Sequence, residues 1–270
     1  MKTKINLLKT FLNLKVGLEN FGVFDGKKVF CWCDGFYMSV PFESGLDKTF
    51  ATNLKEFVRV ADGKENLDFE LHEESESIKI KFKRTRFKIP SISLENTQEE
   101  LDLSDAKSID FGNSNIFLDN LKKAEKFMAI KDIRNYLEGV SIKGSEMGAS
   151  NGCIAILIKD CGLDIGQNII IPRVAVEFLI KTKLTLKTIF FSEVNGKANR
   201  ISFQFENGEI FSSPLIEQTF PDLSSVVFIN EKLPVNELPT EFFDALRELK
   251  AQDKGVGVRL SPTQIEIQEN

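Results

Sequence analysis

Two segments show the clearest structural pattern in the sequence. The first is Leu54-Lys55-Glu56-Phe57-Val58-Arg59-Val60-Ala61, and the second, after an interval, is Ser77-Ile78-Lys79-Ile80-Lys81-Phe82-Lys83. In the first segment, apolar residues recur at the i, i+3, i+4 and i+7 positions, which places them on one face of an α-helix. In the second segment, apolar and basic residues alternate with a period of two, as in a β-strand with one buried face. Together the two segments, with a further strand predicted over Leu67–His72 between them, indicate a short amphipathic helix that packs on a sheet.

The same order of elements recurs on both sides of this unit. The first unit has a helix over Ile5–Lys15 and strands over Phe21–Phe24, Lys28–Cys33 and Tyr37–Phe42. The third has a helix over Ile116–Met128 and strands over Tyr136–Ile142, Met147–Ser150 and Ile154–Ile158. The fourth has a helix that begins at Pro172 and ends at Thr182, with strands over Thr188–Phe191, Arg200–Phe205 and Glu209–Leu215. The fifth has a helix over Pro239–Gln252 and strands over Val256–Leu260 and Gln264–Ile267. The sequence therefore predicts an α+β protein built from repeated helix-plus-antiparallel-strand units.

One segment interrupts this series. Leu94–Ser114 is polar and acidic and has no strong period, which indicates a linker or an edge segment between two domains. We therefore predict a first domain over residues 1–111 and a second over residues 112–232. Residues 233–270 then form a partial third domain or a C-terminal appendage.

Composition and charge narrow the class of protein. With 42% hydrophobic residues, the 270-residue chain has enough apolar material for two ordinary domains, and its 24 Phe residues are the main core filler. No apolar run is long enough to span a bilayer and no secretory segment is evident, so a reduced, cytoplasmic compartment is expected for the four cysteines. The formal net charge of -5 argues against a surface that is basic all over, so the question is whether one face is basic.

Positive charge gathers on the helix faces that point away from the predicted core. The residues concerned are Lys55 and Arg59 in the second helix, Lys122, Lys123 and Lys126 in the third, and Arg173 and Lys181 in the fourth. Exposed cations of this kind attract phosphates diffusely and without sequence preference. The same pattern also serves solubility, and charge alone favours that plainer interpretation.

A catalytic or metal-binding interpretation finds little support. His72, the only histidine, has no orienting partner nearby in the sequence and is better explained as an exposed strand residue. Cys31 and Cys33 share one strand face without a second cysteine pair, so buried packing is favoured over zinc binding. The same interpretation is favoured for Cys153 and Cys161.

Three further patterns are also better explained by structure than by chemistry. The Glu99-Glu100 pair lies in the predicted linker, where a solvated charge run is expected rather than a metal site. The evenly spaced glycines between Gly144 and Gly152 punctuate strands and do not form a phosphate-binding loop. The lysine face of Ser77–Lys83 is a solvated sheet surface. We predict no catalytic residue, no metal and no cofactor.

Several stretches resemble the bacterial β-type DNA sliding clamp, the DNA polymerase III β subunit family, and occur in the family's order. The family's middle-domain segment, from the end of a helix to the first strand, is similar to Ala129-Ile130-Lys131-Asp132-Ile133-Arg134-Asn135-Tyr136-Leu137-Glu138-Gly139-Val140. The family's ATDGHRLA strand corresponds in position to Ala149-Ser150-Asn151-Gly152-Cys153-Ile154-Ala155. The family's Phe-Pro-Asp run is similar to Leu215-Ile216-Glu217-Gln218-Thr219-Phe220-Pro221-Asp222-Leu223. Ile169–Leu179 is similar to its IVPRK segment, and Lys83–Pro90 to its GRSRFSL strand. The resemblance covers nearly the whole chain and is strongest from Phe117 to Val227.

The resemblance implies a clamp fold in which helices line a central hole and the sheets lie outside. It implies a homo-oligomeric ring, without enzyme activity, that encircles double-stranded DNA without sequence preference. It also implies that short peptide motifs of a replicative DNA polymerase and a clamp loader dock on the clamp. By matching positions, the peptide pocket would include Leu137, Ser150, Gly152, Cys153, Ile154, Ala155, Pro221 and Val226. By the same matching, Lys131, Arg134 and Tyr136 lie at a loop that approaches DNA.

The chain departs from the family pattern in two ways. Cys153-Ile154 replaces the His-Arg pair of the family strand, which makes the pocket rim more apolar. The third domain is only half present, so that five half-units do not tile the family's ring evenly. Either the fifth unit is an appendage to a two-domain subunit that trimerises, or the assembly is unconventional. The short length would suit a phage or mobile-element replisome.

A second function stays open from the sequence. A clamp-derived interaction protein that does not form a ring would bind a polymerase, a host clamp or a transcription machinery. Mass in solution separates the two functions, because a clamp is a defined multimer.

Overall fold

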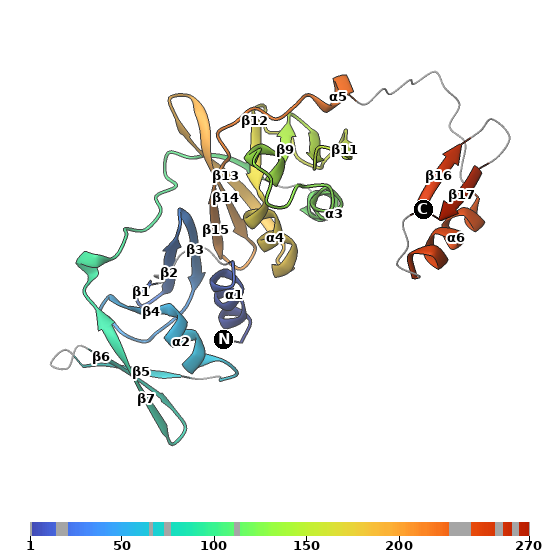
Figure 1. Ribbon diagram of the computed structural model, residues 1–270. Coiled ribbons are helices and arrows are strands. Elements are labelled where there is room, and N and C mark those ends of the chain that lie inside the picture. Colours follow the sequence, from blue (N-terminus) through green and yellow to red (C-terminus); the bar gives the residue numbers. More distant parts are fainter. Residues whose placement is uncertain are drawn as a thin grey trace. The chain divides into compact units, whose positions relative to one another are not determined.

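The computed structural model describes residues 2–14, 21–64, 67–72, 77–110, 114–226, 239–251, 256–260 and 265–269 (Figure 1). The chain divides into two compact units, Met1–Leu223 and Ser224–Asn270. The predicted domain boundary near residue 111 falls within the first unit, whose two halves share one sheet, and this boundary stays a prediction.

The first unit repeats one arrangement of elements. Its first half contains α1 (Lys2–Leu12), β1 (Phe21–Phe24), β2 (Lys28–Cys33), β3 (Phe36–Pro41), β4 (Phe50–Asn53), α2 (Leu54–Ala61), β5 (Asp68–His72), β6 (Ser77–Phe82), β7 (Thr85–Ile92) and the 3-10 helix η2 (Leu94–Asn96). Its second half contains β8 (Lys107–Asp110), α3 (Ser114–Glu125), the 3-10 helix η3 (Asn135–Glu138), β9 (Gly139–Lys143), β10 (Glu146–Ser150), β11 (Ala155–Ile158), β12 (Asn168–Pro172), α4 (Arg173–Thr182), β13 (Leu186–Val194), β14 (Lys197–Phe205) and β15 (Ile210–Pro214). Short strands β4, β8 and β12 precede α2, α3 and α4, so the full repeat is a strand, a helix and three strands.

The helix predicted from Leu54 to Ala61 and the strand predicted from Ser77 form as expected. The backbone N–H of Glu56 donates to Oδ1 of Asn53 at 3.1 Å, which caps the first turn of α2. Phe57 and its apolar neighbours on α2 are buried. On β6, Ile78 and Ile80 are each 1% exposed, while the lysines between them face the other side of the sheet. The helix and the strand predicted from the spacing of apolar residues are therefore both present, each with its apolar side buried.

Two antiparallel sheets carry the first unit. The larger has eleven strands in the order β5-β6-β7-β4-β1-β2-β3-β15-β14-β13-β8, and the smaller has four in the order β11-β10-β9-β12. The strand before each helix pairs with a strand of the neighbouring repeat: β4 with β1, β12 with β9, and β8 with β13, while β4 also pairs with β7 of its own repeat. Each pair of repeats is therefore tied together by an exchanged strand.

The two halves of the unit meet where β3 pairs with β15. Met38 lies opposite Phe211 in this register, and both side chains are fully buried. Above them the ring of Phe178 on α4 stacks on Phe211 at 4.0 Å between centroids, and Phe11 on α1 meets Phe178 edge-on at 6.4 Å. A continuous aromatic core therefore passes from one half to the other.

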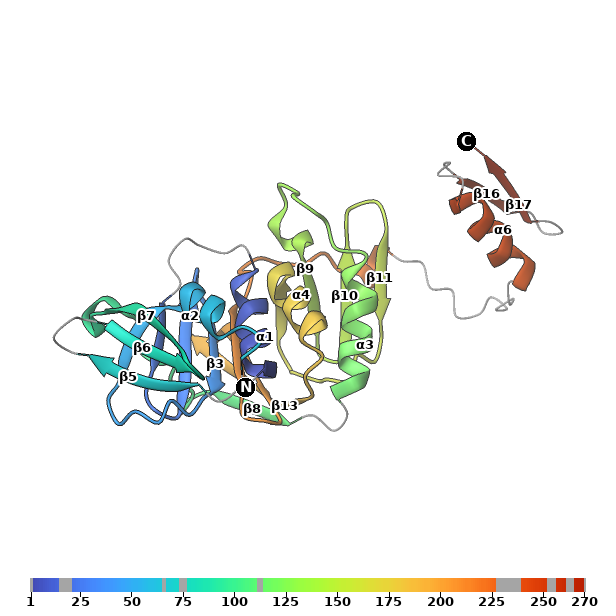
Figure 2. The same ribbon diagram turned by 90° about the horizontal axis from the view of Figure 1, so that it is seen from below.

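The four long helices of the first unit form a single row on one side of its sheets. α1 contacts α2 and α4, and α4 contacts α3, so the order across the row is α2, α1, α4, α3 (Figure 2). One contiguous apolar cluster lies between this row and the sheets. The arrangement gives the unit one helical face and one sheet face.

A smaller apolar cluster lies on the sheet face, around Trp32 and Tyr37. The indole N–H of Trp32 donates to the backbone oxygen of Glu99 at 2.7 Å, and Lys28 pairs with Glu100. The guanidinium of Arg200 lies 5.1 Å from the Trp32 ring. The segment that follows η2 therefore packs across the sheet face, as a linker between the halves would.

Most predicted elements are confirmed within a few residues, with three differences. Residues 135–138 form η3, so the strand predicted from Tyr136 begins only at Gly139. The chain also has strands β4 and β8, which we did not predict, and β8 lies at the edge of the larger sheet inside the predicted linker. Cys31, Cys33 and Cys161 are buried as expected, whereas the prediction for Cys153 is wrong because its side chain is exposed. His72 lies on β5, but its side chain is outside the described residues.

The second unit is small. It contains α6 (Thr240–Ala251) and the hairpin of β16 (Val256–Leu260) and β17 (Ile265–Glu269), while α5 (Leu223–Val226) starts at the last residue of the first unit. Val258 lies opposite Ile267 in the hairpin, and α6 contacts both strands. The predicted fifth unit of one helix and two strands is therefore confirmed.

Candidate nucleic-acid interface and peptide pocket

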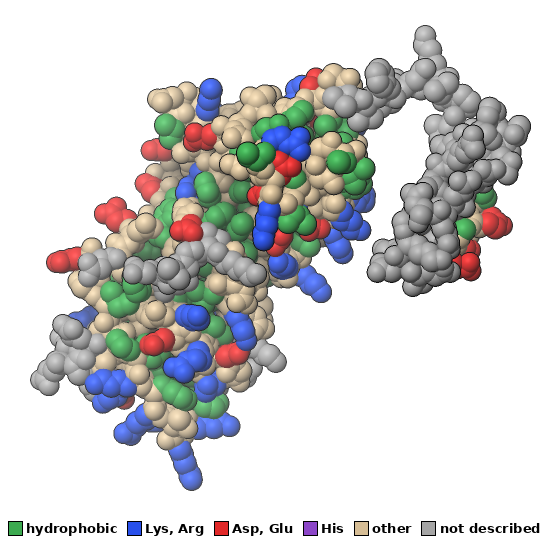
Figure 3. Space-filling model, viewed as in Figure 1, with side chains coloured by type: hydrophobic (Ala, Val, Ile, Leu, Met, Phe, Trp, Pro, Cys, Tyr) green, Lys and Arg blue, Asp and Glu red, His purple; other side chains and the backbone are tan. Residues whose placement is uncertain are grey.

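Basic side chains outnumber acidic ones on the solvent side of the helix row. The exposed or half-exposed cations are Lys4, Lys9, Lys55, Arg59, Lys122, Lys123, Lys126, Lys181 and Lys183. The corresponding acids are Glu56, Asp62, Asp119, Glu125 and Glu177. Lys and Arg side chains gather where α3 and α4 lie (Figure 3). An otherwise acidic chain thus presents a surplus of positive charge on its helical face.

α3 carries the densest group of these cations. Lys122 and Lys123 on the helix and Lys126, the first residue after it, are exposed, while Leu121 and Ala124 on the opposite side of the helix are fully buried. The predicted division of this helix into a basic and an apolar side is confirmed. The ammonium group of Lys123 donates to Oδ1 of Asn120 at 3.1 Å, so part of its hydrogen-bonding capacity is used locally.

The other helices carry fewer of these cations. Lys55 and Arg59 are both exposed on α2. Lys181 on α4 is exposed but pairs with Glu177 at 3.0 Å. Burial alone would raise the pKa of Glu177, but the hydrogen bond and charge of Lys181 hold that pKa below its usual value. We call Lys55, Arg59, Lys122, Lys123, Lys126 and Lys181 the basic helix face.

Arg173 has a different role from the other predicted cations. Its Nη2 donates to the backbone oxygens of Met128 at 2.9 Å and Ala129 at 2.8 Å, and its Nε donates to Ala129 at 3.2 Å. Its side chain is 18% exposed and also lies 3.5 Å from Glu177. Arg173 therefore joins α4 to the chain that leaves α3, and little of its charge is presented to solvent.

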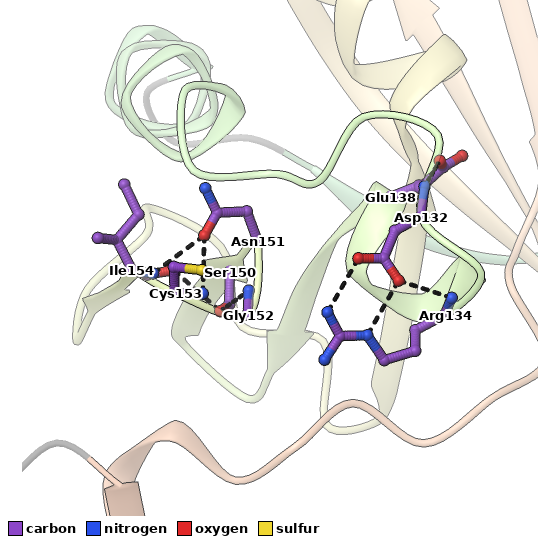
Figure 4. A network of polar contacts seen from close by, with 8 residues as sticks. All are labelled: Asp132, Arg134, Glu138, Ser150, Asn151, Gly152, Cys153 and Ile154. Carbon is purple, nitrogen blue, oxygen red and sulfur yellow. Dashed lines mark hydrogen bonds and ion pairs between the residues drawn. The ribbon is translucent and has the colours of Figure 1, made fainter.

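The loop that follows α3 is held by one bidentate ion pair. Nε and Nη2 of Arg134 donate to Oδ1 and Oδ2 of Asp132, both at 2.9 Å, and the backbone N–H of Asp132 donates to Glu138 at 2.7 Å (Figure 4). Hydrogen bonds to the Asp132 carboxylate, first from the Arg134 side chain and then from the Arg134 backbone N–H, lower the pKa of Asp132 to about 2. Lys131 adopts a left-handed φ of 55° and is exposed. The loop therefore holds its shape while it presents a cation to solvent.

Tyr136 closes the base of this loop. Its ring meets that of Phe220 edge-on at 6.4 Å, and its backbone N–H donates to Oε1 of Gln218 at 3.2 Å. Its side chain is half-buried. Tyr136 thus connects the loop to the Phe220-Pro221 segment and keeps part of its ring accessible.

The loop between β10 and β11 is held by several local hydrogen bonds. Oδ1 of Asn151 accepts the backbone N–H groups of Cys153 and Ile154, both at 3.0 Å, and Oγ of Ser150 accepts that of Gly152 at 3.0 Å (Figure 4). The hydroxyl of Ser150 in turn donates to the backbone oxygen of Ile154 at 2.9 Å. These local bonds fix a turn that leaves the side chains of Cys153 and Ile154 exposed.

The two loops touch at Gly152. Its φ of +88° favours glycine, and a Cβ placed there would lie 2.6 Å from Nη2 of Arg134. The residues predicted from the DNA-facing loop and from the pocket rim therefore belong to one continuous surface.

Solved structures match this architecture. The DNA polymerase sliding clamp of Bacillus subtilis matches with a TM-score of 0.75 and 14% identity, over 98% of this chain and 77% of that one. The DNA polymerase III subunit beta of Borrelia burgdorferi matches with a TM-score of 0.75 and 14% identity, over 99% and 78%. The chain has the DNA sliding clamp fold. The Helicobacter pylori beta clamp, solved with a DNA ligase peptide, matches with a TM-score of 0.71 and 15% identity, over 100% of this chain and 80% of that one. No protein-family model and no curated protein matches the sequence.

In this clamp fold the predicted pocket residues fall into three groups. Leu137 and Ser150 are buried, and Ala155 is half-buried. The exposed members are Gly152, Cys153, Ile154 and Pro221. Val226 lies in the second unit and its side chain is outside the described residues, so its place in the pocket stays a prediction.

Leu223 was not among the residues predicted for the pocket, although it lies close to them. Its side chain is buried, and a Cβ added at Gly148 on β10 would lie 3.0 Å from its Cδ1. Gly148 therefore gives Leu223 the room to pack against the sheet beside the β10–β11 loop. The signal was present in the Phe-Pro-Asp-Leu run, whose last residue is apolar between polar neighbours.

No other chemistry gathers in the described part of the chain. Among those residues, no group of three or more His, Cys, Asp or Glu side chains lies close enough to hold a metal ion. Within the same residues, none of the helices is both long and apolar enough to cross a membrane.

Proposed function

We propose that the chain is a DNA sliding clamp that encircles duplex DNA and tethers a replicative DNA polymerase, and that it performs no chemistry itself. The observation that carries the proposal is the row of α2, α1, α4 and α3 with the basic helix face on its solvent side. Long-range attraction to phosphates holds DNA near such a face, and long flexible cations exchange between phosphates, which permits sliding.

The loops at Arg134 and Gly152 serve docking in this proposal. Ile154, Cys153 and Pro221 offer an apolar, exposed rim beside a fixed turn, which suits a short peptide with Leu or Phe anchors. The solved Helicobacter pylori clamp is bound to a DNA ligase peptide, so a clamp of this fold accepts peptides. We assign the same use here to motifs of the polymerase and of a clamp loader.

The test is topological retention on DNA. The full-length protein, loaded on nicked circular duplex DNA, is expected to stay bound at a salt concentration that removes simple electrostatic binders, and to be lost when the circle is cut. Equal retention on circular and linear DNA would show that the protein does not encircle its substrate. A strictly monomeric mass at high concentration would instead favour a clamp-derived interaction protein without a ring.

A further inference from the structure

A short segment lies across the sheet face of the first half of the first unit. It comprises residues 97–102, and we call it the crossing segment. The indole of Trp32 bonds to its backbone, and Lys28 pairs with one of its acids. Leu101 of the segment packs on the apolar cluster around Trp32 and Tyr37. The crossing segment is therefore held against β2 and β3 by polar and apolar contacts.

Two cavities open between the crossing segment and the sheet. The smaller, of about 190 Å³, also extends to residues 97–98, and its apolar walls come from β1 and β2, namely Phe21, Val23, Phe30 and Trp32. The larger, of about 360 Å³, lies between Trp32, Gly35 and residues 98–102. Trp32 and Gln98 line both cavities, so the cavities are neighbours, and we call them together the Trp32 groove. An apolar cavity of about 150 Å³ holds benzene, so each cavity can take a Phe or Leu side chain.

The rim of the Trp32 groove is acidic. Residues 94–105 contain no Lys or Arg, and they carry five exposed acids, Glu95, Glu99, Glu100, Asp102 and Asp105. Red side chains follow the course of this part of the chain along the left edge of the molecule (Figure 3). Glu99, Glu100 and Asp102 line the larger cavity, and Asp34 lines the smaller.

Most of this negative charge is not neutralised within the chain. Glu100 pairs with Lys28, but no ion pair forms at Asp34, Glu99 or Asp102 in the part of the chain that the structure describes. The guanidinium of Arg200 lies near the ring of Trp32, yet its N–H groups donate to Gly35 and Ser212. The Trp32 groove therefore combines aromatic walls with carboxylates that are open to a cation from outside.

We propose that the Trp32 groove binds a short basic peptide of a partner protein. A Phe or Leu of the peptide enters one of the cavities beside Trp32, and its Lys or Arg side chains pair with Glu99 and Asp102. Charge complementarity selects this partner, because an acidic rim attracts a cationic segment and repels phosphates and acidic peptides. Pockets of this kind read linear motifs through an apolar anchor and flanking charges.

The proposed site goes beyond the clamp function. It lies on β1, β2 and the crossing segment, whereas the predicted peptide pocket is built from η3, β10, β11 and Pro221. It also lies on the sheet face, away from the basic helix face. The chain would thus hold a second partner on a separate surface, and the site does not require a ring.

The emission of Trp32, the only tryptophan, reports directly on the groove. Full-length protein is titrated with the peptide Arg-Lys-Phe-Lys-Leu, which contains no fluorophore that overlaps with tryptophan. A saturable change in emission is expected. Arg-Lys-Ala-Lys-Ala, without the anchors, and Glu-Glu-Phe-Glu-Leu, with the opposite charge, are expected to give none. The proposal fails if the basic peptide gives no saturable change at millimolar concentration, or if all three peptides act alike.

Charge variants with a matched control test the role of the rim. Glu99→Lys with Asp102→Asn changes the charge of the groove, and asparagine keeps an oxygen for the backbone N–H of Ser104. Glu95→Lys with Asp105→Asn makes the same change in net charge at two acids that line neither cavity. The first variant is expected to bind Arg-Lys-Phe-Lys-Leu roughly tenfold more weakly, and the control is expected to bind it as the unmodified protein does. Equal losses in the two variants would show attraction by net charge alone and would overturn the proposal.

Photo-cross-linking locates the anchor independently of fluorescence. In the probe, benzoylphenylalanine replaces the Phe of Arg-Lys-Phe-Lys-Leu, and mass spectrometry identifies the protein residues that it labels. Labels within residues 30–34 or 97–102 are expected. Labels confined to residues 150–155 and Pro221 would place the peptide in the predicted peptide pocket instead and reject the Trp32 groove. Labels scattered over the acidic residues of the surface would reject it as well.

Discussion

The guanidinium of Arg134 occupies the space in which a side chain at Gly152 would have to lie. A Cβ at residue 152 would sit 2.6 Å from Nη2 and 3.2 Å from Cζ of Arg134. Asp132 holds the guanidinium in this position with two hydrogen bonds of 2.9 Å. The loop after α3 and the loop after β10 are therefore in close contact at this point.

Gly152→Ala is expected to destabilise the protein more than Gly166→Ala. Both glycines have a positive φ, so alanine at either residue carries a backbone cost of about 1–2 kcal/mol. Only at Gly152 must Arg134 also move, because a Cβ at Gly166 meets nothing within 4 Å. Urea unfolding measures the difference. In an Arg134→Ala background the two alanine variants are expected to cost the same, and a difference that persists there would contradict the contact.

The pKa of Asp132 is expected to show whether the ion pair between Asp132 and Arg134 forms in solution. The hydrogen bonds from Arg134 lower that pKa from 3.8 to about 2. Because the folded-state pKa is depressed, the pair contributes fully above about pH 4 and its contribution is lost as the pH falls through about 2. A carboxyl NMR titration measures this, and Arg134→Ala is expected to raise the pKa towards its ordinary value.

Asp102 is the matched control for that titration. Its pKa is also below the ordinary value, but the cause is its hydrogen bonds with Ser104. Arg134→Ala is therefore expected to leave the pKa of Asp102 unchanged. A wild-type Asp132 that titrates near 4, or a shift shared by both groups, would refute the ion pair in solution.

Arg200 is expected to stabilise the joint between the two halves of the first unit. Its Nη2 donates to the backbone oxygen of Gly35 at 2.7 Å, and its Nη1 donates to Oγ of Ser212 at 3.0 Å. Arg200→Ala is expected to cost about 1.5–3 kcal/mol in the free energy of unfolding, as for hydrogen bonds to a charged group. The emission of Trp32, the only tryptophan, is expected to change because the guanidinium lies 5.1 Å from its ring.

Lys197→Ala on the same strand is the control for this prediction. Lys197 is exposed, so its removal is expected to change stability by less than about 0.5 kcal/mol and to leave Trp32 emission unaltered. Equal effects of the two variants would show that Arg200 contributes nothing specific to the joint.

The helix and strand pattern could be predicted because binary patterning and burial coincide over most elements. The strand over Lys28–Cys33 has the predicted bounds, since its apolar residues and its turn at Asp34-Gly35 are unambiguous. β4 escaped prediction because its four residues run directly into α2 and are too few to show a period. The strand was predicted to begin at Tyr136, but this residue lies in η3. The sequence does not distinguish the two, because an apolar residue directly before a strand can be the first residue of that strand or part of a 3-10 turn.

The candidate site could be predicted only in part. The charge pattern predicted the exposed cations of α3. It did not indicate that the guanidinium of Arg173 donates hydrogen bonds to the backbone oxygens of Met128 and Ala129. Nor does sequence separation of eighteen residues reveal that Arg134 lies on Gly152. Such contacts depend on how loops from different elements are brought together, which the local pattern does not encode.

Charge reversal on α3 is expected to weaken retention on DNA. Replacing Lys122, Lys123 and Lys126 by Glu changes three exposed cations, on α3 and at its C-terminal end, to anions and leaves the buried side of the helix untouched. Phosphate attraction depends on these charges, so the deficit of the variant relative to the unmodified protein is expected to be largest at low salt and to shrink as salt screens the charges. The measurement is the fraction retained against salt concentration, compared with the unmodified protein.

The matched control reverses three cations on the other side of the molecule. Lys79, Lys81 and Lys88 lie on β6 and β7, on the sheet face opposite the buried Ile78 and Ile80. Their replacement by Glu alters the net charge by the same amount, so any general electrostatic effect appears in both variants. Retention that falls only for the α3 variant locates the DNA on the helical face. Equal losses would mean that net charge alone governs binding, and a larger loss for the sheet variant would place the DNA on the wrong side for a clamp.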